Sequence, residues 1–69
     1  MRRPLTQYDR DRLEQLREWV MEADLVGGSM GTALHLTQLE ESGLVNRNFR
    51  ANGEPMLRIS HRGRRLLDG

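Results

Sequence analysis

The chain has 69 residues, of which 36% are hydrophobic and 30% are charged, and it contains no cysteine. A chain of this length forms one small domain that buries only about 60% of its unfolded surface, so we expect a homodimer to add stability. The absence of cysteine excludes a disulfide framework and a thiolate zinc site. The longest apolar run is three residues, which argues against a membrane span or signal peptide and makes a cytoplasmic location the expectation.

The formal net charge of +1 hides an uneven distribution. Residues 1–45 hold five arginines and eight acidic residues (−3), whereas residues 46–69 hold six arginines and two acidic residues (+4). All eleven basic residues are arginine. The codon bias of a GC-rich genome explains the lack of lysine as well as a functional requirement for arginine does. The rigid donor fork of arginine suits phosphate and guanine edges, so the position of the charge indicates nucleic-acid chemistry in the second half of the chain.

Residues 1–5 contain two arginines and a proline, and we expect them to form a flexible arm before a single domain at residues 6–69. Thr6 and Asp9 have the spacing of a capping box, which marks a helix start. From there to about Asp24 the chain lacks glycine and proline, and apolar residues recur at intervals of three and four. This pattern predicts one long helix with an apolar stripe formed by Leu13, Leu16, Val20 and Ala23.

Two aromatic residues belong to this predicted long helix. Both are large rings with a polar edge and could anchor an interface, but Trp19 lies beside the apolar stripe, and we favour it as the main core residue of so small a domain. Tyr8 lies outside the stripe, which makes it the better candidate for an interface.

A second helix is expected from Met30 to Ser42, with Ser29 as its N-cap. The preceding Gly27-Gly28 pair could suggest a phosphate-binding loop, but no Lys-Ser or Lys-Thr follows and no strand precedes, which excludes a P-loop. We interpret the pair as a tight corner between helices, and Gly43 as the left-handed stop of the second helix.

A β-hairpin is expected after Gly43. If residues 52–54 form a three-residue loop, Phe49 lies opposite Leu57, and Val45 shares their apolar face with Ile59. The solvent face then carries Asn48, Arg50, Met56 and Arg58. Beyond the hairpin, Ser60 is a predicted N-cap for a short final helix at residues 61–68, whose Leu66 and Leu67 return to the core.

One motif in this region is Leu39-Glu40-Glu41-Ser42-Gly43-Leu44-Val45. After the basic hairpin, a second motif is Leu57-Arg58-Ile59-Ser60-His61-Arg62-Gly63-Arg64. Together they resemble winged helix-turn-helix transcription regulators of the MarR-like and PadR-like kind. The similarity covers roughly the last 40 residues. It implies a small α+β winged helix with a long N-terminal helix, a recognition helix, a two-stranded wing and a short C-terminal helix. The second helix of the usual helix-turn-helix is expected to be reduced or absent here.

The resemblance implies a sequence-specific DNA-binding transcriptional regulator whose partner is double-stranded DNA. Its recognition helix would enter the major groove, and its wing would hold the neighbouring backbone. The residues expected to contact DNA are Gly31, Leu34, His35, Thr37 and Gln38 in the helix, Asn48, Arg50 and Arg58 in the wing, and Arg62, Arg64 and Arg65 after it.

An alternative reading is a winged-helix module that binds a protein, such as a phage or mobile-element modulator of a larger complex. It is motivated by Leu34, which stands where the family commonly has Arg, Ser or Thr, and by the near-neutral net charge. We expect no enzyme activity, because the chain contains no catalytic constellation or nucleotide fingerprint. We also expect no cofactor and no metal, since the two histidines lack carboxylates at ligand spacing.

Overall fold

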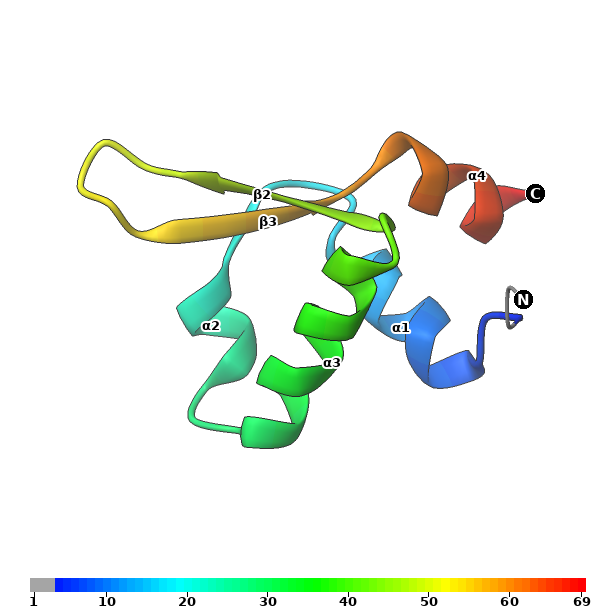
Figure 1. Cartoon of the computed structure of the whole chain (residues 1–69), viewed down its shortest axis with the longest axis horizontal. Coiled ribbons are helices and arrows are strands. Elements are labelled where there is room, and N and C mark those ends of the chain that lie inside the picture. Colours follow the sequence, from blue (N-terminus) through cyan, green and yellow to red (C-terminus); the bar gives the residue numbers. More distant parts are fainter. Residues whose placement is uncertain (1–3) are drawn as a thin grey trace.

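The computed structural model describes residues 4–69 as four helices and a three-stranded antiparallel sheet. The helices are α1 (Gln7–Gln15), α2 (Glu22–Val26), α3 (Met30–Glu41) and α4 (His61–Asp68), and the strands are β1 (Val20–Met21), β2 (Val45–Phe49) and β3 (Pro55–Ile59). The strand order is β1-β3-β2. In Figure 1 the helices α1, α2 and α3 lie on one side of the sheet, and the β2–β3 hairpin projects away from α4. The expected α+β class is confirmed.

The prediction of one long N-terminal helix is wrong, because α1 ends at Gln15 and β1 follows it. The carbonyl of Leu16 accepts a hydrogen bond from the backbone N–H of Ile59 in β3, at 2.6 Å. That carbonyl would have accepted from Val20 if the helix had continued. Val20 instead pairs with Leu57 across the sheet, as its β-branched side chain favours.

A second short helix, α2, occupies five residues before the paired glycines. It ends at Gly27, whose φ of 51° is in the left-handed region that glycine adopts without strain. No separate helix was predicted at these five residues, because the first helix was expected to continue to about Asp24. None of the helices in residues 4–69 has the length and apolar character needed to cross a membrane.

The predictions for α3 and α4 are confirmed to within a residue. The Ser29 side chain accepts from the backbone N–H of Thr32 at the start of α3, and Gly43 follows its end with a φ of 78°. Ser60 caps α4 by accepting from the N–H of Gly63.

The hairpin pairing differs from the prediction. Phe49 lies opposite Pro55 rather than Leu57, and Val45 lies opposite Ile59. Residues 50–54 form the connection, which is closed by hydrogen bonds from Arg50 N–H to the Glu54 carbonyl and from Gly53 N–H to the Arg50 carbonyl. Because the pairing is shifted by two residues rather than one, the paired residues stay on their predicted faces, with Val45, Leu57 and Ile59 buried. Phe49, at the end of β2, is nevertheless 59% exposed, so its predicted place on an apolar face does not bury it.

The core consists of eight buried aliphatic residues contributed by α1, α3, the sheet and the turn between α3 and β2. They are Leu13, Leu16, Leu36, Leu39, Leu44, Val45, Leu57 and Ile59. Leu66 and Leu67 pack against this core as predicted. Trp19 does not belong to it: the indole is 41% exposed, so the prediction of a central tryptophan is wrong. Of the expected arm, residues 1–3 lie outside the described residues, and Leu5 packs partly against the core.

Candidate nucleic-acid interface

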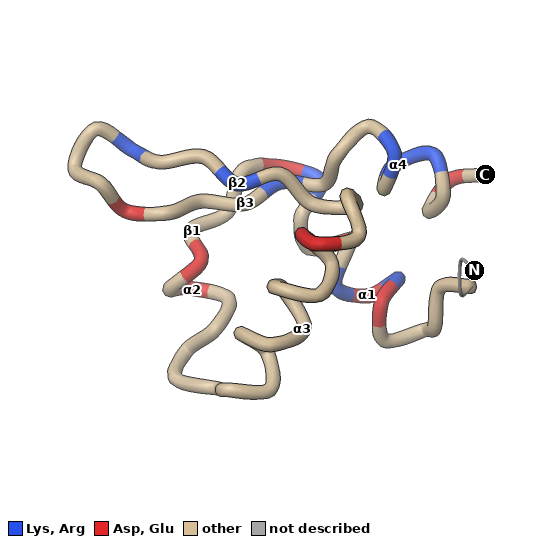
Figure 2. Tube along the Cα trace, in the orientation of Figure 1, with Lys and Arg blue, Asp and Glu red and all other residues tan. Residues whose placement is uncertain are grey.

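The outer face of α3 is exposed along its whole length. Its side chains are mainly apolar or uncharged: Met30, Gly31, Leu34, Thr37, Gln38 and Glu41. Met30 is 84% exposed and Leu34 is 59% exposed. Figure 2 shows no basic residue along this helix and acidic residues only at its C-terminal end. Four of the five helix residues expected to contact DNA thus lie on the surface: Gly31, Leu34, Thr37 and Gln38. None of these four residues carries a positive charge.

His35 is the exception, and its predicted position on the outer face is wrong. Its side chain is only 5% exposed, between α3 and α1. His35 and Leu39 are four residues apart and therefore share one face of the helix, the face that enters the core. The imidazole Nε2 lies 2.6 Å from Oδ1 of Asp9, and the ring of Tyr8 stacks on it with centroids 4.1 Å apart.

Tyr8 borders the exposed face of α3. It is 54% exposed, and the guanidinium of Arg12 lies over its ring, 5.4 Å from the centroid. An open hollow of about 410 Å³ lies between the start of α1 and the outer face of α3, and its walls include Tyr8, Leu34 and Gln38. This meeting of α1 with the outer face of α3 could not be predicted from the sequence, because it depends on the packing of α1 against α3.

The two faces of the sheet differ in their surroundings. On the face that carries Val45, the guanidinium of Arg47 binds the carboxylates of Glu22 in α2 and Glu40 in α3, at 2.7 and 3.1 Å. That face is therefore covered by helices. The opposite face, here called the outer sheet face, carries Met21, Asn46, Asn48, Met56 and Arg58.

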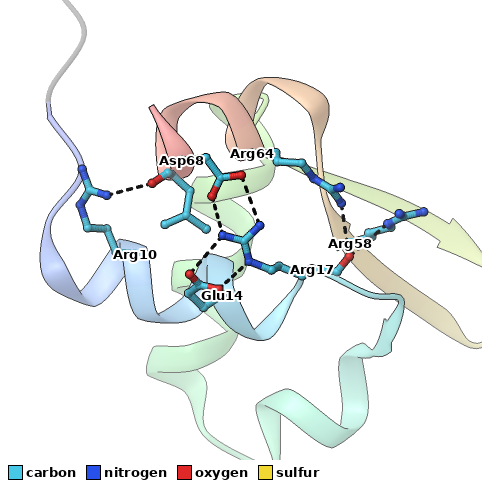
Figure 3. Close-up of polar contacts among 7 residues, drawn as sticks. Arg10, Glu14, Arg17, Arg58, Arg64 and Asp68 are labelled. Carbon is cyan, nitrogen blue, oxygen red and sulfur yellow. Dashed lines mark hydrogen bonds and ion pairs between the residues drawn. The ribbon is translucent and has the colours of Figure 1, made fainter.

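Two arginines converge at one end of the outer sheet face. Arg58 Nε and Arg64 Nη2 both donate to the backbone carbonyl of Arg17, each at 3.4 Å (Figure 3). At the other end, Nη1 of the exposed Arg50 lies 4.0 Å from Sδ of Met21. The side of the sheet opposite α3 thus carries Arg50, Arg58, Arg64 and Asn48.

The remaining arginines of α4 point elsewhere. Arg62 precedes Arg64 by two positions, about 200° around a helix. Its guanidinium lies beside Gly43, since a Cβ on that glycine would be 3.7 Å from Nη1. Arg62 and Arg65 line a separate hollow on α4. The five arginines that were expected to contact DNA are therefore divided between two places.

Two arginines that the sequence analysis did not single out hold elements together. Arg47 has just been described, and Arg17 bonds to Glu14 in α1 and to Asp68 in α4 (Figure 3). Hydrogen bonds from Arg17 lower the pKa of both Glu14 and Asp68 below the ordinary carboxyl range. The pairing of Arg17 with Glu14 at i, i+3 is readable from sequence, whereas the contacts to Asp68, Glu22 and Glu40 need the fold.

Within residues 4–69, no group of three or more histidine, aspartate or glutamate side chains is placed to hold a metal ion. Comparisons of the chain with protein-family models, with curated proteins and with solved structures gave no match.

Proposed function

We propose that this protein is a winged-helix transcriptional regulator that binds double-stranded DNA in a sequence-specific way. The observation that supports this most is the order of its elements: a helix, a short strand, two helices and a hairpin, with strand order β1-β3-β2. In this proposal α2 and α3 form the helix-turn-helix, α3 is the recognition helix, and the β2–β3 hairpin is the wing.

Base recognition in this proposal depends on Gln38 and Leu34. A glutamine can bind adenine through two hydrogen bonds in the major groove, and an aliphatic side chain can contact a thymine methyl group. Both side chains are exposed on α3. The preference would therefore be for sites rich in A·T pairs, with Thr37 and Gly31 close to the backbone.

Phosphate contacts in this proposal come from outside α3, because α3 has no basic residue. Arg50 lies in the hairpin loop, and Arg62 lies beside Gly43 at the C-terminal end of α3. Arg62 thus adjoins the recognition helix, whereas Arg50 lies in the hairpin loop beside Met21 and would contact the backbone beyond the groove that α3 enters. With few cations at this surface, we expect modest affinity and a shallow salt dependence.

The experiment is selection of preferred sequences from random duplex DNA, with the wild-type chain and with Gln38→Ala. The wild-type chain should enrich one motif, and Gln38→Ala should lose discrimination at one base pair, by roughly 5- to 150-fold. Gln7→Ala, an exposed glutamine on α1, is the matched control and should retain the motif. The absence of any enriched motif, or an unchanged motif with Gln38→Ala, would contradict the proposal.

A second candidate function is favoured by the same face of α3. Met30 and Leu34 expose apolar surface and no cation accompanies them, which suits a protein partner better than phosphate. The substitution Leu34→Arg separates the two candidates. A DNA reader should keep or gain affinity for duplex DNA, whereas a protein-binding module should lose its partner.

A further inference from the structure

Trp19 has an unusual position for the single tryptophan of a small domain. It lies in the turn between α1 and β1 with its side chain 41% exposed, although tryptophan offers more apolar surface for a core than any other residue. Together with Asn46, Arg58, His61 and Arg64, it lines an open hollow of about 280 Å³. The hollow thus places an exposed indole beside two guanidinium groups.

The charges of Arg58 and Arg64 are not neutralised by ion pairs within residues 4–69. Arg17 and Arg47, by contrast, each bind two carboxylates. The hydrogen bonds that Arg58 and Arg64 make to the Arg17 carbonyl orient both side chains, which are half-buried. An anion that binds both guanidiniums would therefore meet cations that are already partly ordered, which lowers the entropic cost of binding.

The shape and chemistry of the hollow indicate the class of ligand. Its volume is slightly below the range of about 300–1,000 Å³ typical of small-molecule sites, so it fits one unit of a longer chain. Guanidiniums bind phosphates, and an exposed indole stacks on a nucleobase. A base inside a duplex is already stacked on its neighbours, so only an unpaired strand offers its face to Trp19.

We propose that the outer sheet face binds single-stranded nucleic acid, with phosphates at Arg58 and Arg64 and one base stacked on Trp19. The outer sheet face continues from Arg58 to Met56 and Met21, so the strand would run along the β2–β3 hairpin. Asn46 and Asn48 project from β2 on the same side and offer amide groups to bases or sugars.

This second surface goes beyond the proposed function of α3 and does not depend on it. Arg47, on the helix-covered face, reaches α2 and α3, whereas Arg58 projects from the other face, so the sheet separates the two surfaces. A chain with both surfaces would hold a duplex and an unpaired strand on opposite sides.

The test uses Trp19 as its own reporter, because it is the only tryptophan in the chain. The full chain is titrated with oligothymidylate, and tryptophan fluorescence is recorded across a salt series. We expect quenching at low salt that is reversed by added salt. In the double variant Arg58→Ala/Arg64→Ala, affinity should fall at least about tenfold, and the salt slope should decrease by about 1.4, since each phosphate contact on a single strand contributes about 0.7.

The matched control is Arg10→Ala/Arg65→Ala, which removes two exposed arginines outside the hollow and outside the phosphate contacts proposed for duplex DNA. It should leave both quenching and salt slope unchanged. An equal loss in the control, no quenching at low salt, or tighter binding of a duplex with the same dependence on Arg58 and Arg64 would overturn the proposal.

A second variant guards against loss of folding, because Arg58 and Arg64 also hydrogen-bond the Arg17 carbonyl. Trp19→Leu is followed by the anisotropy of labelled oligothymidylate, with circular dichroism to verify its helices. Loss of stacking should weaken binding about tenfold or more. Unchanged affinity in folded Trp19→Leu would overturn the proposed stacking. Duplex selection with Gln38→Ala tests α3 separately, so either surface can fail without the other.

Discussion

The imidazole Nε2 of His35 in α3 lies 2.6 Å from Oδ1 of Asp9 in α1, and both side chains are buried. Arg12 Nε–H donates to the other ring nitrogen of His35, which assigns the proton of a neutral imidazole to Nε2 and makes it the donor to Asp9. Asp9 also completes the capping box of α1 with Thr6. One carboxylate thus stabilises the start of α1 and its packing on α3.

Replacement of Asp9 should therefore destabilise the domain well beyond the loss of a helix cap. In Asp9→Ala the imidazole N–H loses its acceptor in a buried site and the capping box is broken, so the free energy of unfolding should fall by about 2–4 kcal/mol. Urea denaturation followed by circular dichroism measures this. Asp11→Ala, at an exposed position on the same helix, should stay within about 0.5 kcal/mol of wild type. Equal effects of the two substitutions would contradict the role of Asp9.

The predictions that succeeded rest on interactions between residues close in sequence. The caps at Thr6, Ser29 and Ser60 each join a side chain to a backbone N–H three residues later, so a short motif contains all the information needed. The inward positions of Val45, Leu57 and Ile59 in the hairpin were also predicted, because alternation along a strand has a period of two. Most of the outer face of α3 followed from helical spacing, as for Leu34 and Gln38.

The predictions that failed depend on partners distant in the chain. The spacing of apolar residues alone predicts that the first helix continues to Val20. Instead, the backbone N–H of Ile59 donates to the Leu16 carbonyl, and the helix ends there. Trp19 is then left in a turn rather than on a buried stripe. The partners of Arg47, 7 and 25 residues away, are likewise set by packing of α2 and α3 on the sheet. The solvent-face position of Arg58 followed from strand alternation, whereas the packing of α3 on the other face of the sheet did not.

Gly63 and Gly31 should respond in opposite directions to the same substitution. A Cβ at Gly63 would overlap the Leu44 carbonyl and lie 2.9 Å from Cγ1 of Ile59, so Gly63→Ala should cost about 1–3 kcal/mol through displacement of α4. A Cβ at Gly31 meets nothing closer than 3.9 Å, and Gly31→Ala should raise stability by up to about 1 kcal/mol through helix propensity. Thermal unfolding of both variants checks this; a stabilised Gly63→Ala would show that α4 is not packed so closely on Leu44 and on Ile59 of β3.

The pKa of Asp68 should depend on Arg17. Its pKa in the folded chain lies below the ordinary value of 3.8, chiefly because Arg17 donates hydrogen bonds to it. A carboxyl with a lowered pKa stabilises the folded state above the ordinary carboxyl range, and this contribution is lost as the pH falls through the lowered pKa. NMR titration of the carboxyl carbon should show the pKa of Asp68 returning toward 3.8 in Arg17→Met. Arg10→Met removes an α1 arginine that bonds to Leu67 instead, and should leave that pKa low.

Arg47 and Arg50 lie three positions apart in the hairpin segment and should have separable roles. Arg47 binds Glu22 and Glu40, so Arg47→Ala should lower the free energy of unfolding by about 1.5–3 kcal/mol, as for hydrogen bonds between charged groups. Arg50 is exposed in the loop without an ion pair in residues 4–69, so Arg50→Ala should leave stability within about 0.5 kcal/mol of wild type.

For binding to duplex DNA, Arg50→Ala should have a larger effect than Arg47→Ala, the reverse of their order for stability. Loss of one phosphate contact in Arg50→Ala should lower the salt slope of binding by about 0.9. Arg47→Ala, measured at a temperature where it remains folded, should keep the wild-type slope because its guanidinium is occupied by the two carboxylates. Fluorescence anisotropy across a salt series gives both slopes. If Arg50→Ala binds DNA with the wild-type slope, the hairpin loop does not contact the phosphate backbone, and the wing assignment fails.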